Sequence, residues 1–151
     1  MTKMQKPVSY AERVFPSVSF LVAGLFLPAA LFLISLPFSL ELAFLVAAGS
    51  YFSLLATSYV LAPKILLTEE VLQVSRAVIP TKHLGLARVI ERQDQFSERG
   101  QQLSTLAYTR FQIGVKGLVK IDIADESDPT PYWLVATRHP EVLAGYLNAK
   151  R

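Results

Sequence analysis

The stretch SVSFLVAGLFLPAALFLISL, Ser17–Leu36, decides the fold because its 20 residues include no ionisable side chain. At a helical rise of about 1.5 Å per residue it reaches roughly 30 Å, the thickness of the hydrocarbon core of a bilayer. A buried helix of a soluble bundle would need a polar face, and this stretch has none. A cleaved signal peptide would be followed by a polar cleavage region, whereas a second apolar run begins almost immediately here. The stretch therefore predicts a transmembrane helix.

The second apolar run, LELAFLVAAGSYFSLLATSYVLA (Leu40–Ala62), is also long enough to cross a bilayer with some tilt. Only three residues separate the two runs, so we expect a tight antiparallel hairpin over residues 16–62. Pro37 ends the first helix and Ser39 can cap the second. Glu41 then falls in the first turn of the second helix, where a carboxylate is favoured by the helix dipole. We therefore interpret Glu41 as a residue at headgroup level, not as a proton carrier in the bilayer.

Small residues predict where the two helices touch. Ala43 and Ala47, and then Gly49 and Ser53, are each four positions apart and permit close backbone approach. Pro28 lies inside the first helix and removes the donor that the carbonyl group of Gly24 would otherwise receive. We therefore expect a mild kink in the first helix.

The charges that flank the hairpin predict its orientation. The tip of the hairpin carries no cation, whereas both flanks do; these cations are Lys3, Lys6 and Arg13 before it and Lys64, Arg76 and Lys82 after it. Because cytoplasmic flanks are enriched in Lys and Arg, both termini are predicted to be cytoplasmic, in a multi-pass protein of the plasma membrane. Residues 1–15 form the N-terminal cytoplasmic segment, and the aromatic rings of Phe15 and Tyr59 are expected near the same membrane face.

The region from Pro63 onward changes to the period of two residues that is typical of strands. In LVKIDIAD (residues 118–125), apolar side chains alternate with polar ones. The pattern predicts strands at Ile65–Leu67, Val71–Val78, Leu84–Ile90, Phe111–Val115, Leu118–Asp125 and Tyr132–Thr137. Lys116–Gly117 reads as a tight hairpin turn. The polar segment Arg92–Leu106 is left open between a short helix and a long loop.

The stretch DPTPYWLVATRHPE, Asp128–Glu141, contains the single Trp of the chain. Its prolines Pro129 and Pro131 predict a turn, and Tyr132–Thr137 then reads as a strand. Pro140 is favourable at the first position of a helix, whose apolar stripe follows in EVLAGYL. The stretch therefore predicts a strand, a sharp corner and a closing helix.

These elements together predict a transmembrane α-helical hairpin followed by a small antiparallel β domain with a C-terminal capping helix. The domain covers residues 63–151, and its outline is that of a pleckstrin-homology-like (PH-like) domain. A generic α+β sandwich is the alternative. With roughly 60% of its surface buried, a domain of this size is marginally stable by itself.

Two apolar runs, then LTEEVLQVSRAVIP, then DPTPYWLVATRHPEVLAGYL resemble the bacterial DUF3093 family of small two-span membrane proteins. The resemblance covers nearly the whole chain and is strongest at Asp128–Pro140, where the family shows a DPTPYWLVSTRRP-like signature. This chain has Ala136 where serine is common and His139 where arginine is common. The resemblance implies a membrane anchor and a cytoplasmic PH-like domain, and it implies no chemistry.

Composition and motifs argue against an enzyme. Without cysteine the chain has no thiol nucleophile, disulfide or Cys-ligated zinc, and no cofactor motif is present. His83 and His139 lie far apart in the chain, and no nucleophile, base and orienting group can be assembled. The carboxylates of residues 122–128 match no calcium-loop pattern and are interpreted as a solvated turn, so no metal site is predicted. A net charge of +3 without a basic stripe indicates no nucleic-acid binding.

The leading hypothesis is a binding or scaffold module tethered to the bilayer. Its candidate contacts are Trp133, Arg138 and His139, and its expected partners are anionic lipid headgroups or another membrane protein. For Trp133 the competing interpretation is packing in the core, because Trp is often buried. The second hypothesis is an accessory subunit of a transporter or envelope enzyme that acts through the hairpin.

Overall fold

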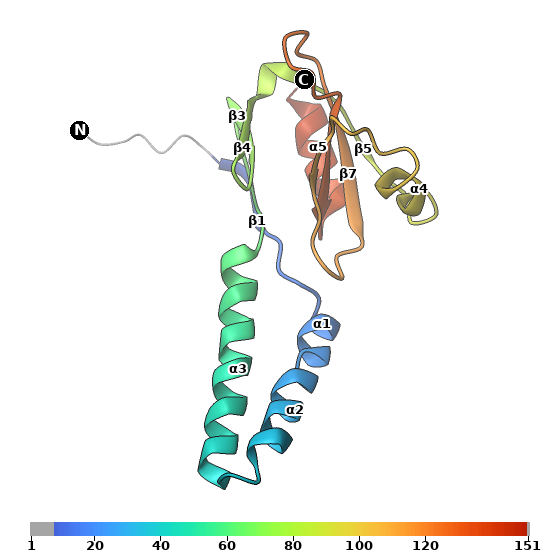
Figure 1. The fold of residues 1–151 in the computed structure, drawn as a ribbon. Helices are drawn as coiled ribbons and strands as arrows, with labels where there is room; N and C mark the ends of the chain where they lie inside the picture. Colours follow the sequence, from blue (N-terminus) through green and yellow to red (C-terminus); the bar gives the residue numbers. More distant parts are fainter. Residues whose placement is uncertain (1–7, 151) are drawn as a thin grey trace, which may run out of the picture. The chain divides into compact units, whose positions relative to one another are not determined.

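The computed structural model describes residues 8–150, which form two compact units (Figure 1). The helical unit comprises Phe15–Ala62, and the β unit comprises the described residues up to Val14 together with those from Pro63 onward. Lys3 and Lys6, which contributed to the predicted orientation, lie outside the described residues. Two apolar helices, strands and a C-terminal helix follow in the predicted order, which confirms the coarse architecture.

The helical unit contains three helical segments; these are α1 (Val18–Ala23), α2 (Phe26–Ser35) and α3 (Leu40–Leu61). Ser39 caps α3 as predicted, since its hydroxyl oxygen accepts a hydrogen bond of 3.0 Å from the backbone N–H of Leu42. The interruption between α1 and α2 lies just ahead of Pro28, as the missing proline donor predicts. Val18–Ser35 and Leu40–Leu61 are each long and apolar enough to cross a membrane.

Close contacts between the helices involve one of the predicted small-residue pairs. Ala43 is fully buried, whereas Gly49 and Ser53 are exposed, so their predicted contact within the hairpin is wrong. At about 100° per residue, Gly49 lies roughly 240° around α3 from Ala43 and faces away from the other helix. Gly24 makes a close contact between the helices that the sequence did not predict. A Cβ atom at this position would clash with the side chain of Leu54 in α3.

Aromatic pairs join both ends of the hairpin. The rings of Phe32 and Phe44 lie 5.1 Å apart between centroids in an edge-to-face arrangement. At the other end, the rings of Phe15 and Tyr59 lie 5.9 Å apart, so these two side chains do gather at one end as the sequence predicted.

The first sheet of the β unit is an antiparallel meander in the order β1-β2-β3-β4. Its strands are β1 (Val8–Arg13), β2 (Lys64–Thr68), β3 (Val71–Val74) and β4 (Ala77–Pro80). The single strand predicted over Val71–Val78 is wrong, because Ser75 adopts a φ of 57° and turns the chain into a hairpin. The sequence also placed residues 1–15 in a separate segment, whereas their described part supplies β1.

The second sheet has the order β5-β7-β8-β6. Its strands are β5 (Leu84–Val89), which follows the 3-10 turn η1 (Thr81–His83), β6 (Tyr108–Arg110), β7 (Gly117–Ile123) and β8 (Tyr132–Thr137). β6 pairs in parallel with β8, so the expectation of a wholly antiparallel domain is wrong. The strand predicted at Phe111–Val115 and the hairpin at Lys116–Gly117 are wrong for the same reason. β6 and β7 lie on opposite edges of β8, so the intervening loop must cross β8 and cannot pair.

The core lies between the two sheets and under helix α5 (Pro140–Ala149). All six residues of β8 are buried, because Trp133 and Val135 face this core while Tyr132 and Leu134 face the segment 90–107 on the other side. That segment holds the short helix α4 (Gln95–Arg99), which settles the question that the sequence left open.

Polar contacts attach segment 90–107 to the outer face of the second sheet. The hydroxyl group of Tyr132 accepts a hydrogen bond of 2.8 Å from the backbone N–H of Ser104 and donates to the carbonyl oxygen of Gln102. The ammonium group of Lys120 lies 2.9 Å from the carboxylate of Glu98, and both side chains are largely buried. The segment is therefore an integral layer of the β unit.

Candidate functional site

The stretch Asp128–Glu141 closes the β unit, as the sequence predicts: a turn, strand β8, a sharp corner and helix α5. The corner is held by Glu12 of β1, more than a hundred residues away in the chain. The carboxylate of Glu12 accepts hydrogen bonds from the Thr137 hydroxyl group, at 2.5 Å, and from the backbone N–H of Arg138, at 2.8 Å. Thr137 is fully buried, and its hydroxyl oxygen also accepts from the backbone N–H of His139.

Tyr10 completes this network from the same strand. Its hydroxyl group donates to Glu12 over 2.6 Å, and its ring lies 6.1 Å from the ring of Tyr146 in α5. Burial raises the pKa of Tyr10 to about 12, and the hydrogen bond to the Glu12 carboxylate raises it in the same direction. Tyr10 is therefore a neutral donor at physiological pH, and the corner is a structural joint.

The predicted contact residues occupy different environments at this joint. Trp133 is 5% exposed and packs in the core with its ring centroid 4.8 Å from that of Tyr108, so it offers no surface to a partner. Arg138 and His139 are exposed at the corner itself. The structure therefore separates Trp133 from the other two candidate residues and assigns it the packing role that the sequence left as the alternative.

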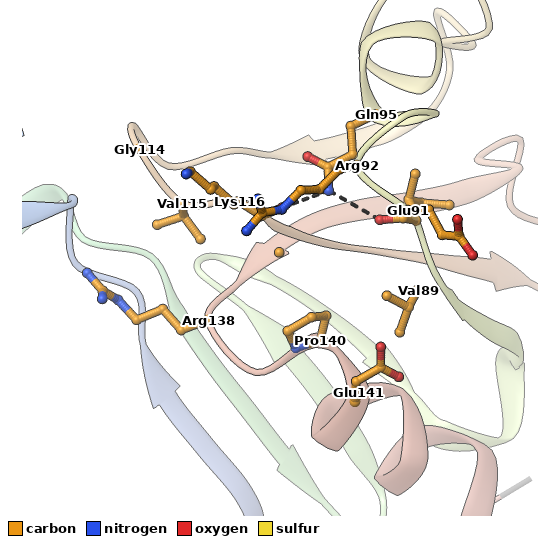
Figure 2. Close-up of a pocket in the computed structure, with 12 residues that line it drawn as sticks. Val89, Glu91, Arg92, Gln95, Gly114, Val115, Lys116, Arg138, Pro140 and Glu141 are labelled. Carbon is orange, nitrogen blue, oxygen red and sulfur yellow. Dashed lines mark hydrogen bonds between the residues drawn. The ribbon is translucent and has the colours of Figure 1, made fainter.

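A cleft of about 660 Å³ opens beside the corner (Figure 2). Three segments that are distant in sequence line it: the end of β5 and its continuation, the loop before β7, and the start of α5. The side chain of Gln95 fixes two of these walls, because it donates to the carbonyl oxygens of Ile90, at 3.2 Å, and Lys116, at 2.7 Å. Gly117 allows the close approach of the third wall, since a Cβ atom there would clash with the Thr137 backbone and with Pro140.

The cleft is rimmed mainly by cations. Arg92, Lys116 and Arg138 line it together with the carboxylates Glu91 and Glu141. The Glu91 carboxylate accepts a hydrogen bond from Gln93 at 3.1 Å, and in Figure 2 it lies on the side opposite Lys116 and Arg138. Within residues 8–150, neither Arg92 nor Lys116 lies within ion-pair distance of a carboxylate. With Glu141 also in the lining, the three cations exceed the two carboxylates by one positive charge, and this excess favours an anionic group on the side of Lys116 and Arg138. Sequence reasoning found Arg138 but missed Arg92 and Lys116, because only the fold brings them together.

Comparison with known protein families shows to which family the chain is related. The sequence model of a protein family of unknown function, DUF3093, matches residues 9–147. The chain belongs to the DUF3093 family. No curated protein and no solved structure matches it. The DUF3093 match runs from β1 to α5, so the family unit includes the N-terminal strand, both long helices and the closing helix.

The turn between β7 and β8 of this DUF3093 protein, here called the acidic turn, contains Asp125, Glu126 and Asp128 and lies at the end of β7 that is far from the cleft. Asp125 accepts hydrogen bonds from the side chain and the backbone of Ser127, which lower the pKa of Asp125 below its ordinary value. His83 lies 3.4 Å from the same carboxylate group. In the part of the chain that the structure describes, no three His, Asp or Glu side chains are grouped to hold a metal ion. The turn is stabilised by its own hydrogen bonds.

Proposed function

We propose that this protein crosses the plasma membrane twice and holds its β unit at the inner leaflet as a binding or scaffold module. The observation that carries the proposal is the exposure of the apolar helices. Within the two long helices only Pro28 and Ala43 are buried, and this supports a lipid environment around the remaining apolar side chains. Large side chains such as Phe26, 81% exposed, and Leu45, 72% exposed, match a lipid environment.

The orientation is tested by cysteine labelling, since the chain has no cysteine of its own. We expect a membrane-impermeant maleimide to label Phe38→Cys, at the tip of the hairpin, on intact cells. The variant Glu126→Cys, in the β unit, is expected to react only after the cells are opened. Labelling of Glu126→Cys on intact cells would overturn the proposed topology.

The proposed binding surface is the cationic cleft. Arg92, Lys116 and Arg138 are suited to a phosphate or carboxylate group. The ligand class is therefore anionic, and the role proposed is non-enzymatic. The PH-like character of the β unit, expected from the sequence, is part of this proposal.

Charge reversal tests the cleft. A photo-crosslinking residue at position 142, beside the cleft, is expected to capture a partner in the parent chain and to lose it in Arg92→Glu/Lys116→Glu. Both side chains lie outside the core, so the variant should unfold at the temperature of the parent. Unchanged capture in a folded double variant would remove the cleft from the proposal.

An accessory subunit that acts through its spans is the second candidate. The outward position of Gly49 and Ser53 on α3 favours it, because small residues allow another helix to approach closely. Exchange of residues 17–62 for an unrelated two-span hairpin separates the candidates. Loss of the in-cell function would favour the accessory subunit, and its retention would favour the tethered module.

A further inference from the structure

The two chain connections that lead to the helices are held together within the β unit. The backbone N–H of Val14 donates a hydrogen bond of 2.8 Å to the carbonyl oxygen of Pro63. Val14 lies three residues before Ser17, and Pro63 directly follows Ala62. Covalent continuity therefore keeps this end of the β unit, here called the junction end, within a few residues of the apolar helices, whatever the angle between the two units.

The loop between β6 and β7 is attached to the junction end. The side-chain amide of Gln112 donates to the carbonyl oxygen of Val14 over 2.9 Å. Three residues further on, Val115 is 6% exposed and belongs to the core, and Gly114 reverses the chain with a φ of 72°. Ile113 lies between these two attachments and is 59% exposed. Its outward position is thus fixed by the contacts of its neighbours.

Phe111 adds a second apolar side chain to this loop. It is 37% exposed, and the guanidinium group of Arg99 lies 5.2 Å from its ring centroid. Single exposed apolar residues are ordinary on protein surfaces. Two of them on a fixed loop, at the point where the chain leaves for its apolar helices, form a surface suited to a bilayer interface.

Charge is distributed unevenly along the β unit. The pairing of the strands shows which cations lie at the junction end. Arg13 pairs with Lys64 in the first sheet, and in the second sheet Arg110 pairs with Val135 and Gly117 pairs with Thr137. The cations at these positions and next to them in the chain therefore lie at the junction end. These cations are Arg13, Lys64, Arg76, Arg92, Arg110, Lys116 and Arg138. The carboxylates Glu12, Glu91, Asp94 and Glu141 also lie there, and Glu12 is engaged by Thr137 and Tyr10.

The opposite end of β7 is acidic. Asp122, Asp125, Glu126 and Asp128 lie at or beyond that end, where β7 turns back to β8. Arg88 pairs with Asp122 at 3.0 Å and His83 lies 3.4 Å from Asp125, so carboxylates outnumber the cations there but are partly balanced by them. A strand of seven residues separates the two ends by roughly 20 Å, about two Debye lengths at physiological ionic strength. An anionic surface therefore attracts the junction end and repels the acidic turn.

We infer that the loop Phe111–Lys116 docks on the anionic inner leaflet, with Ile113 inserted at the level of the headgroups and the cations of the junction end facing lipid phosphates. The inference rests on the proposed membrane anchorage and names the surface of the β unit that meets the lipid. A basic loop with outward apolar side chains combines the two contributions that hold proteins at bilayer interfaces.

The test uses the full chain in vesicles of phosphatidylcholine and phosphatidylglycerol that contain a headgroup-labelled nitroxide lipid. An environment-sensitive fluorophore is attached to Ile113→Cys or, as the matched control, to Glu126→Cys at the acidic turn. We expect the emission at position 113 to be blue-shifted and quenched at least twofold more than at position 126. Addition of Lys116→Glu to Ile113→Cys, or replacement of the anionic lipid by phosphatidylcholine, should reduce the quenching.

Equal quenching at positions 113 and 126, in chains that resist carbonate extraction, would overturn the docking of the loop and leave the anchorage intact. Release of the chain by carbonate would instead overturn the proposed anchorage itself. Strong quenching at position 113 that is insensitive to lipid charge and to Lys116→Glu would overturn the electrostatic part of the inference.

Discussion

Glu12 shows how a single side chain can join distant segments of a small domain. Its carboxylate receives hydrogen bonds from Tyr10, Thr137 and the backbone of Arg138, so it connects β1 to the corner between β8 and α5. The corner itself could be predicted from Pro140 and from the apolar stripe that follows. The identity of its partner could not, because no local pattern relates Glu12 to residues so far along the chain.

Removal of the Glu12 carboxylate is expected to destabilise the protein. In Glu12→Ala, the buried Thr137 hydroxyl group and the N–H of Arg138 lose their acceptor, a loss that typically costs about 1–3 kcal/mol. Thermal unfolding in detergent should show a lower Tm. Glu126→Ala, on the exposed acidic turn, is the control and is expected to leave Tm unchanged. A Glu12→Ala protein as stable as the control would show that the network contributes nothing.

The raised pKa of Tyr10 predicts how the free energy of unfolding changes at alkaline pH. Its pKa is about 12 in the folded chain and near 10 when unfolded, so the neutral form is the one that folding favours. The resulting stabilisation is fully present below pH 10 and is lost as pH rises towards 12. Tyr10→Phe has no such group, so we expect its free energy of unfolding to fall less than that of the parent between these pH values. Parallel curves for the two proteins would contradict the assignment.

At the scale of elements, the strands of the second sheet show what periodicity can and cannot predict. β7 has one polar and one apolar face and was predicted correctly. β8 is buried on both faces, so alternation carries no information there, and its position followed from the flanking prolines instead. The parallel pairing of β6 with β8 is a tertiary property. β1 has six residues but includes Ser9, Glu12 and Arg13, so its weak apolar alternation did not indicate a strand without the partner β2 beside it.

Replacement of glycine by alanine is expected to change the stability in opposite directions at two positions, Gly117 in β7 and Gly145 in α5. In Gly117→Ala, the new Cβ atom would clash with the Thr137 backbone and Pro140, where β7 meets the corner, and we expect a loss of about 2 kcal/mol or more. Gly145 lies in α5, and a Cβ atom there has no neighbour within 4 Å. Gly145→Ala should stabilise the protein by roughly 0.5–1 kcal/mol through helix propensity. Denaturant unfolding of both variants measures the difference, and a loss of stability in Gly145→Ala would contradict the open surroundings of that position.

Across the whole molecule, the apolar helices were evident from composition, whereas the extent of the β unit was not. The chain leaves this unit after Val14 and returns at Pro63, so its sequence is interrupted by the helices but its fold is continuous. The cationic cleft is likewise formed by segments that are distant in the sequence. Arg92, Lys116 and Arg138 are unremarkable singly, and they form a site only because three segments converge beside the corner.

This continuity predicts that the β unit folds without its helices, provided that β1 is retained. Val14 and Pro63 are joined by a hydrogen bond of 2.8 Å, so a linker of about four Gly or Ser residues in place of residues 15–62 closes a short gap at little entropic cost. We expect this chain to be a soluble monomer that unfolds cooperatively.

The matched chain of residues 63–151 lacks Glu12 and the fully buried Val14, and it exposes the edge of β2, so it should unfold at a lower temperature or aggregate. Sedimentation and circular dichroism compare the two chains. Equal stability would show that β1 is dispensable, and aggregation of both would show that the β unit depends on the helices.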